Sequence, residues 1–272
     1  MPIWNNLDLI LSTYLSRNSP DLKNLQIHLE KLRKEYSKKL LFSDPLKFPR
    51  RYKTFEDREI SALISALFAY GRVLSIENFL DRIHRFLGDS PYKGILENKN
   101  WKDGGYRFQS EKDVDRFFKA ISTIVKDYGN LENLFASFKG SPEEKLLSFA
   151  LYFRKTVKVD TFGLDHLLSI PSKKSPAKRW RLFLRWVVRK DDGLDLGLWK
   201  ILNPSDLIIP LDTHIAKTAL ALGLTKRKTR DFQFALEVTE KLKAICKDDP
   251  LKYDFALVRE GILKNYLKGG FK

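Results

Sequence analysis

The sequence predicts an all-α protein that forms one compact body. Apolar residues recur at the three- and four-residue spacing of a helix face along most of the chain, and clear strand alternation is missing. The 272 residues are 43% hydrophobic, with nineteen Phe and five Trp, which is enough apolar surface for a packed core. Because the chain shows neither an internal repeat nor a low-complexity linker, we expect a single domain over residues 1–272.

The first helices follow from apolar faces. Residues 60–70, ISALISALFAY, are apolar on nearly every side and predict a central buried helix. Two later helices each show one apolar face, made by Phe79, Leu80, Ile83, Phe86 and Leu87 and by Val114, Phe117, Phe118, Ile121, Ile124 and Val125. Ser141 followed by Pro142 is typical of a helix N-cap and first helical residue, and Ser175 followed by Pro176 repeats the pattern.

Three further helices are expected in the last quarter of the chain. The stretch IIPLDTHIAKTALALGL, residues 208–224, leaves an apolar run at Asp212 and enters a helix that Gly223 closes. The last two helices run roughly over residues 231–245 and 251–267, separated by KDDP.

The charge of the chain favours a polyanionic partner. Fifty Lys and Arg against 34 acids give a net charge of +16, with a pI of about 9.7. Nucleic acid is the leading partner, although an anionic membrane surface or a charged protein could use the same field, and a charge excess also serves solubility.

The cysteine content and the N-terminus indicate a reducing, cytoplasmic location, associated with the nucleoid if the protein binds DNA. The single Cys246 excludes an intramolecular disulfide framework, a multi-cysteine zinc site and a four-cysteine iron–sulfur cluster. Residues 1–18 carry no basic leader before an apolar core, and they include Asp8. No run approaches the ~18 uncharged apolar residues of a membrane-spanning helix.

A basic stripe marks the segment SPAKRWRLFLRWVVRKDD. At about 100° per residue, Lys178, Arg181, Arg185 and Arg189 fall within an arc of about 80° on one helix face. Because stacked cations repel one another at each i,i+4 contact, a phosphate backbone is one explanation for them. The other is a solvated face that is balanced by acids, either nearby, such as Asp191 and Asp192, or on another helix. Lys173 and Lys174 precede this helix, where backbone N–H groups also attract anions, and favour phosphate contact.

Asp212 has two compatible interpretations. As an N-cap, its carboxylate accepts hydrogen bonds from the next turn and stays ionised. A rigid, ionised carboxylate flanked by apolar surface is also suited to stabilise a sugar cation as a glycosidic bond breaks. His214, in the first turn beyond Asp212, either packs or binds a phosphate, and Trp199 is expected in the core.

These residues carry a resemblance to a known superfamily. PLDTHIAKTALALGL resembles the segment with the catalytic aspartate in the helix-hairpin-helix DNA glycosylases, and DDPLKYDFALVREGIL and DREISALISALFAYGR resemble their final and early buried helices. Together with DPLKFPRRY and KRWRLFLRWVVRKDDGLDLGLW, they are closer still to an uncharacterised family of bacterial conserved hypothetical proteins. The onward likeness to glycosylases rests mainly on residues 160–262.

The resemblance implies a two-lobed helical body with a cleft that receives a flipped nucleotide. Asp212 would stabilise the oxocarbenium ion or orient an attacking water, and Lys178 would be the Schiff-base nucleophile of a bifunctional enzyme. In the alternative interpretation, Lys178 is one residue of the basic stripe and contacts a phosphate. The chain reads SIPSKKSPAKRW where the superfamily has Leu-Pro-Gly-Val-Gly, so the hairpin is degenerate and lacks both phosphate-approaching glycines. The cluster-binding cysteines of many relatives are also missing, and no cofactor is expected.

Two functions are predicted from this sequence. The first is a DNA glycosylase or glycosylase/lyase acting on a damaged base, with DNA favoured over RNA. The alternative is a non-catalytic nucleic-acid-binding protein on a glycosylase-like scaffold, for which the missing glycines are the argument. A metal-dependent phosphohydrolase would need His166, Asp165, Asp212 and His214 to converge, and no HxH, HD or HExxH spacing supports such a metal site.

Overall fold

The all-α prediction is confirmed. The structure is a computed structural model that describes residues 22–36 and 44–268. Over these residues the regular elements are helices, without a strand, and one isolated antiparallel bridge joins Tyr106 and Gln109. The α-helices are α2 (Leu22–Glu35), α3 (Phe55–Leu67), α4 (Val73–Leu87), α5 (Pro91–Leu96), α6 (Glu111–Tyr128), α7 (Leu131–Ser137), α8 (Pro142–Val157), α9 (Phe162–Leu167), α10 (Lys178–Val188), α11 (Thr213–Ala221), α12 (Phe232–Ile245) and α13 (Asp254–Lys268). Short 3-10 helices are η2 (Pro45–Lys47), η3 (Pro49–Arg51), η4 (Pro204–Asp206) and η5 (Pro250–Tyr253).

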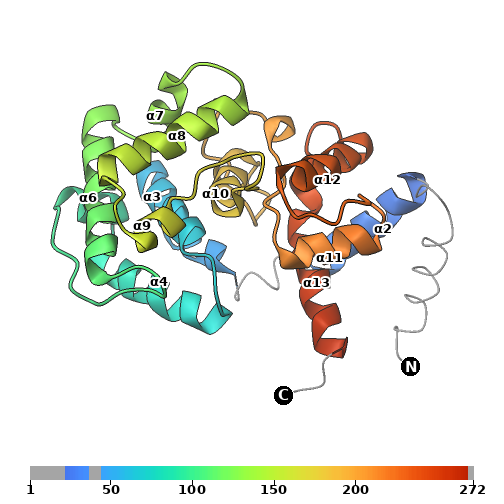
Figure 1. The fold of residues 1–272 in the computed structure, drawn as a ribbon, viewed down its shortest axis with the longest axis horizontal. Helices are drawn as coiled ribbons and strands as arrows, with labels where there is room; N and C mark the ends of the chain where they lie inside the picture. The colour runs from blue at the N-terminus through green and yellow to red at the C-terminus, as the bar shows by residue number, and fades with distance from the viewer. Residues whose placement is uncertain (1–21, 37–43, 269–272) are drawn as a thin grey trace.

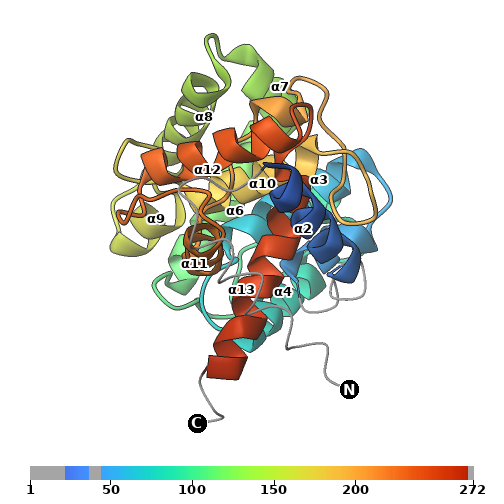
Figure 2. The same cartoon turned by 90° about the vertical axis from the view of Figure 1, so that its right-hand side faces the viewer.

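The helices form two groups with α10 between them. Figure 1 shows α3, α4 and α6–α9 on one side of the molecule and α2 with α11–α13 on the other. Helix α10 packs against α3, while α13 packs against both α11 and α2, which flank it in the turned view (Figure 2). The buried hydrophobic residues of both groups form one continuous core.

Helix α3 is the central buried helix that the sequence predicts. Its residues from Ile60 to Leu67 are all buried, because apolar or small side chains occupy every face. Helix α10 lies against it and is buried on nearly all sides as well, with Trp180 and Trp186 fully enclosed. Two all-round buried helices at the centre explain why the core spans both groups of helices.

The start of α8 is confirmed, whereas the predicted start of α10 is wrong. Ser141 caps α8 in a capping box with Glu144, and Pro142 is the first helical residue. Ser175 and Pro176 instead lie in a loop before α10, which begins at Lys178. The chain turns at Ala177, whose φ of 45° is left-handed, so the helical path cannot extend back to Ser175.

The last two helices agree with the prediction. Asp231 caps α12, and α13 begins at Asp254 after the η5 turn. Gly261 lets α13 approach α11 closely, since a Cβ at this position would lie 2.8 Å from the carbonyl oxygen of His214. This contact sets how the beginning of α11 sits over α13.

Two expectations concern membranes and targeting. The prediction that residues 1–18 carry no basic leader before an apolar core concerns residues outside the part of the chain that the structure describes. In the ranges that the structure describes, none of the helices combines the length and the apolar character needed to cross a bilayer.

Candidate functional site

A cavity of about 420 Å³ opens where α10, α11 and α13 meet the turn between α3 and α4. Its walls are partly apolar, with Pro210, Phe255 and Val258 among them. The charged side chains of the lining are Asp44, Lys178, Arg185, Asp212, Asp254 and Arg259. A volume of this size falls within the range of about 300–1,000 Å³ that is typical of small-ligand sites.

Asp212 stands at the edge of this cavity as the N-cap of α11. Its Oδ1 accepts hydrogen bonds from the backbone N–H groups of His214, at 2.9 Å, and Ile215, at 2.8 Å. These bonds and the positive end of the helix dipole fix the carboxylate in place. The cap interpretation is therefore confirmed, and it leaves Oδ2 for a second partner.

The second partner of Asp212 is Lys178. The Nζ of Lys178 lies 3.3 Å from Oδ2 of Asp212, and the two side chains are 33% and 16% exposed. Lys178 is the first residue of α10 and Asp212 the cap of α11, so two helix starts meet at the cavity. The structure brings together the two residues that the resemblance marks as catalytic, although their roles stay predictions.

The apolar run before Asp212 explains its rigid placement. Leu207, Ile208, Ile209 and Leu211 are buried. The backbone N–H of Ile209 donates to Oγ1 of Thr239 on α12, at 3.0 Å. A buried extended segment thus delivers Asp212 to the cavity with little freedom to move.

Asp254 is a member of the site that sequence reasoning did not single out. It is the first residue of α13, its side chain is buried, and its Oδ2 pairs with Nη1 of Arg185. Its Oδ1 is also buried and has no hydrogen-bond partner within the described part of the chain. Burial, with a further contribution from the negative charge of Asp212, raises the pKa of Asp254 to about 6, against the opposing effect of Arg185. The sequence signal was an acid directly after a proline-led turn at a helix start.

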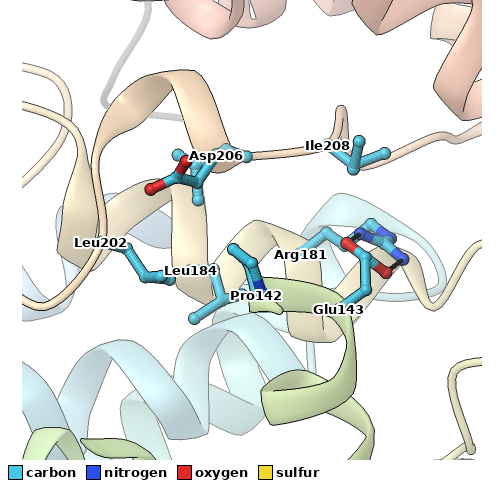
Figure 3. Close-up of a pocket in the computed structure, with 8 residues that line it drawn as sticks. Pro142, Glu143, Arg181, Leu184, Leu202, Asp206 and Ile208 are labelled. Carbon is cyan, nitrogen blue, oxygen red and sulfur yellow. Dashed lines mark hydrogen bonds and ion pairs between the residues drawn. The ribbon is translucent and has the colours of Figure 1, made fainter. Parts of the chain in front are cut away.

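The prediction of a solvent-facing basic stripe is wrong for Arg181, Arg185 and Arg189. All three are buried, and acids on other segments pair with them. Arg181 forms a bidentate pair with Glu143 of α8, with both N···O distances at 2.6 Å, and Figure 3 shows the two side chains facing each other. These three arginines are not available to a phosphate backbone.

The other two arginines of the stripe share Asp195. Arg185 donates to its Oδ1 from Nε, at 3.1 Å, and from Nη2, at 3.0 Å, and Arg189 pairs with its Oδ2. Arg189 also forms two bonds of 2.8 Å with Asp249. Burial acts to lower the pKa values of Arg185 and Arg189, but the carboxylates paired with these arginines raise the pKa values above the usual value. The three arginines are therefore partners in internal ion pairs, and Lys178 and Arg185 are the residues of the stripe that line the cavity.

The remaining predicted residues occupy different environments. Lys173 and Lys174 are exposed in a turn closed by backbone bonds between Ser172 and Ser175. His214 lines the cavity. Trp199 is a core residue, as predicted, and its Nε1 donates to the buried Glu59 at 2.6 Å.

No metal centre is found among the described residues, because nowhere in those ranges do three or more His, Cys, Asp or Glu side chains gather as ligands. His166 instead lies among aromatic rings, with its own ring tilted against those of Tyr70 and Phe108 at centroid distances of 4.7 Å. In the cavity, Asp212, Lys178 and Asp254 are titratable groups suited to ionic and proton-transfer chemistry.

Comparison with known proteins places the chain in a family. The model of the family described as a protein of unknown function (DUF2400) matches residues 44–263. The chain belongs to this family. The matched span includes Lys178, Asp212 and Asp254, so the whole charged centre of the cavity lies within the DUF2400 region. Neither the curated proteins nor the solved structures gave a match to the chain.

Proposed function

We propose that the protein is a base-excision DNA glycosylase or glycosylase/lyase, which cleaves the N-glycosidic bond of a damaged base. One observation carries this proposal: Asp212 and Lys178, from two different helix starts, lie 3.3 Å apart at a cavity of about 420 Å³. The resemblance selects these residues by motif alone, without reference to their separation. Their meeting at a cavity is what a shared reaction site requires.

The chemistry assigned to Asp212 is electrostatic. When the bond between the base and C1′ breaks, its electron pair leaves with the base and the sugar becomes cationic. A carboxylate that is already ionised and fixed by two backbone N–H groups stabilises that cation without reorganising. Water then adds to C1′, and the proton that it loses balances the one taken up by the departing base.

In the lyase form, Lys178 replaces the water. Its amine, after giving up a proton to solvent or to the paired carboxylate, attacks C1′ with its lone pair. The bond between C1′ and the ring oxygen then breaks, the ring oxygen takes up one proton from the nitrogen and becomes a hydroxyl, and a protonated Schiff base remains between Nζ and C1′. The position of Lys178 at the cavity edge, one-third exposed, leaves its Nζ accessible to an incoming nucleotide.

Nucleic acid as the substrate is supported by charge. The chain carries a net charge of +16, and Lys173 and Lys174 are exposed in the turn that leads to Lys178. These lysines are suited to hold the phosphates beside a nucleotide in the cavity. The buried arginines of α10 make no contribution to this contact.

The second candidate is a non-catalytic nucleic-acid-binding protein. The observation in its favour is the loop of residues 171–177, which lacks the two hairpin glycines of the superfamily. In that case Asp212 serves only as a helix cap, and its pair with Lys178 joins two helices. Both candidates bind DNA, so only the reaction separates them.

Borohydride trapping on damaged duplexes separates the two candidates. Wild type and Lys178→Ala are incubated with duplexes that bear oxidised, deaminated or alkylated bases, and Lys190→Ala is the matched control, because Lys190 is an exposed lysine just after the far end of α10 and does not line the cavity. We expect base release by the wild type on at least one duplex. For a lyase we also expect a covalent adduct that Lys178→Ala loses and Lys190→Ala retains. Salt-dependent binding with no base release on any duplex would favour the non-catalytic candidate.

A further inference from the structure

A tight hairpin tip lies beside the cavity. The backbones of Tyr106 and Gln109 exchange two hydrogen bonds of 2.9 Å, which leaves Arg107 and Phe108 exposed at the tip. Arg107 adopts a left-handed φ of 52°, a conformation that a non-glycine residue rarely takes. The fold therefore holds an apolar ring and a cation in a strained position on its surface.

Buried polar contacts fix this tip in place. The side chain of Gln109 is buried, donates from Nε2 to the carbonyl oxygen of Gly163 on α9 at 2.6 Å, and accepts a bond from the hydroxyl of Tyr70. Gly163 allows the tip to sit close, since a Cβ there would lie 2.5 Å from the carbonyl oxygen of Phe108. The tip and α9 thus form one rigid support.

Four aromatic side chains form a patch on this support: Tyr70, Phe108, Phe162 and His166. Phe162 is 70% exposed and Phe108 44% exposed, and their ring centroids lie 5.5 Å apart. The rings of Tyr70 and Phe108 are parallel within 2°, and His166 lies 4.7 Å from both. We call these four side chains the aromatic patch.

The surroundings of the aromatic patch are cationic. The guanidinium of Arg107 lies 5.5 Å from the ring centroid of Phe108, and that of Arg179 lies 4.8 Å from that of Tyr70. Burial, with the charges of Arg179 and Arg107, lowers the pKa of His166, so its ring is neutral at pH 7. The neighbouring acid Asp165 is paired with Arg154 at 2.7 Å.

The aromatic patch is continuous with the cavity. Tyr70 belongs to both, and Gly71, the next residue of the cavity lining, lies against Arg107. A Cβ at Gly71 would be 3.0 Å from Cδ and from Nη1 of Arg107. The aromatic patch is therefore placed to contact the nucleotides next to one that enters the cavity.

We infer that the aromatic patch is a stacking surface for unpaired nucleotides beside the one in the cavity. This inference rests on the proposed nucleic-acid function. It specifies in addition that the bound nucleic acid is locally single-stranded. Every base has a π face that stacks on an aromatic ring, but in a duplex these faces are covered by neighbouring pairs. Exposed rings next to a cation match an unpaired strand, which offers bases and phosphates together.

Equilibrium binding to undamaged oligonucleotides tests the inference without requiring catalysis. The affinity of the wild type and of the double variant Phe108→Ala/Phe162→Ala is measured by fluorescence anisotropy. The probes are a single-stranded 12-mer, an abasic 12-mer with the same phosphates, and a blunt duplex. Leu151→Ala on α8 is the matched control, because Leu151 is also 44% exposed but lies outside the aromatic patch.

We expect the double variant to lose about fivefold or more in affinity for the single strand, as stacking contributions of this kind predict. Affinity for the abasic strand and for the duplex should be unchanged, and Leu151→Ala should behave as the wild type. Equal losses on the abasic strand, or unchanged affinity for the single strand, would overturn the inference. So would self-association that the double variant abolishes while strand affinity stays the same, because the rings would then be a protein contact. If the wild type binds none of the three probes, the proposed function itself fails.

Discussion

Replacing Asp195 tests whether the arginines of α10 are structural. Asp195 is fully buried and accepts three hydrogen bonds, two from Arg185 and one from Arg189. Breaking a buried ion pair by removing one partner costs about 3–5 kcal/mol, because a charge is left uncompensated. Arg185 keeps Asp254 and Arg189 keeps Asp249, which places the expected loss at the lower end, about 3 kcal/mol. That is a large part of the ~5–15 kcal/mol by which a protein of this kind is stable.

Urea unfolding of Asp195→Ala and Asp195→Asn measures this loss. The midpoint should fall while the slope with denaturant stays constant, because the folded surface is unchanged. Asp191→Ala is the control, since Asp191 pairs with Arg50 and Arg58 near the surface and should cost about 1 kcal/mol or less. If Asp195→Ala lowers the free energy of unfolding by less than about 1 kcal/mol and also binds DNA more tightly, the internal ion-pair network is contradicted. The arginines would then be phosphate-binding residues.

Two further predictions concern the helices around the cavity. Gly261→Ala should destabilise the protein by about 1–3 kcal/mol in the same unfolding assay and lower base release, because the new Cβ would press on the carbonyl of His214 at the start of α11; wild-type stability and activity would contradict the close contact. For Asp254, the folded-state pKa of about 6 lies above the usual value of 3.8, so the unfolded chain releases this proton first as pH rises. The free energy of unfolding of the wild type, relative to that of Asp254→Asn, should therefore fall by about 3 kcal/mol between about pH 4 and 6 and stay constant at higher pH. A relative free energy of unfolding that instead rises over this pH range would show that Arg185 holds the carboxylate ionised.

Much of the fold could be predicted because local signals and burial agreed. The run ISALISALFAY is apolar on nearly every side, and its residues 60–67 form most of the interior helix α3, which ends at Leu67 before the last three residues of the run. Ser141 and Pro142 are a cap and a first residue that need no distant partner, and α8 begins there. The start of α10 was mispredicted, because Ala177 takes a left-handed conformation that ordinary local preferences do not favour.

The site could be predicted only in part. The spacing of Arg181, Arg185 and Arg189 correctly places them on one face, but periodicity cannot show which side of a helix meets solvent. Glu143 lies 38 positions from Arg181 and Asp254 lies 69 positions from Arg185, so no local pattern connects these two pairs. Asp212 and Lys178 were found through motif resemblance, and their contact depends on the packing of two helix starts.

The most direct test of the central claim compares two helix-capping aspartates. Asp231 caps α12 and pairs with Arg227, much as Asp212 caps α11 and pairs with Lys178, but Asp231 does not line the cavity. Single-turnover base release is measured for wild type, Asp212→Asn and Asp231→Asn on the damaged duplex that the wild type processes, with folding checked by unfolding curves. We predict that Asp212→Asn loses base release while remaining folded and bound to DNA, and that Asp231→Asn keeps the wild-type rate. Equal rates for all three proteins would contradict the claim and leave Asp212 as a helix cap alone.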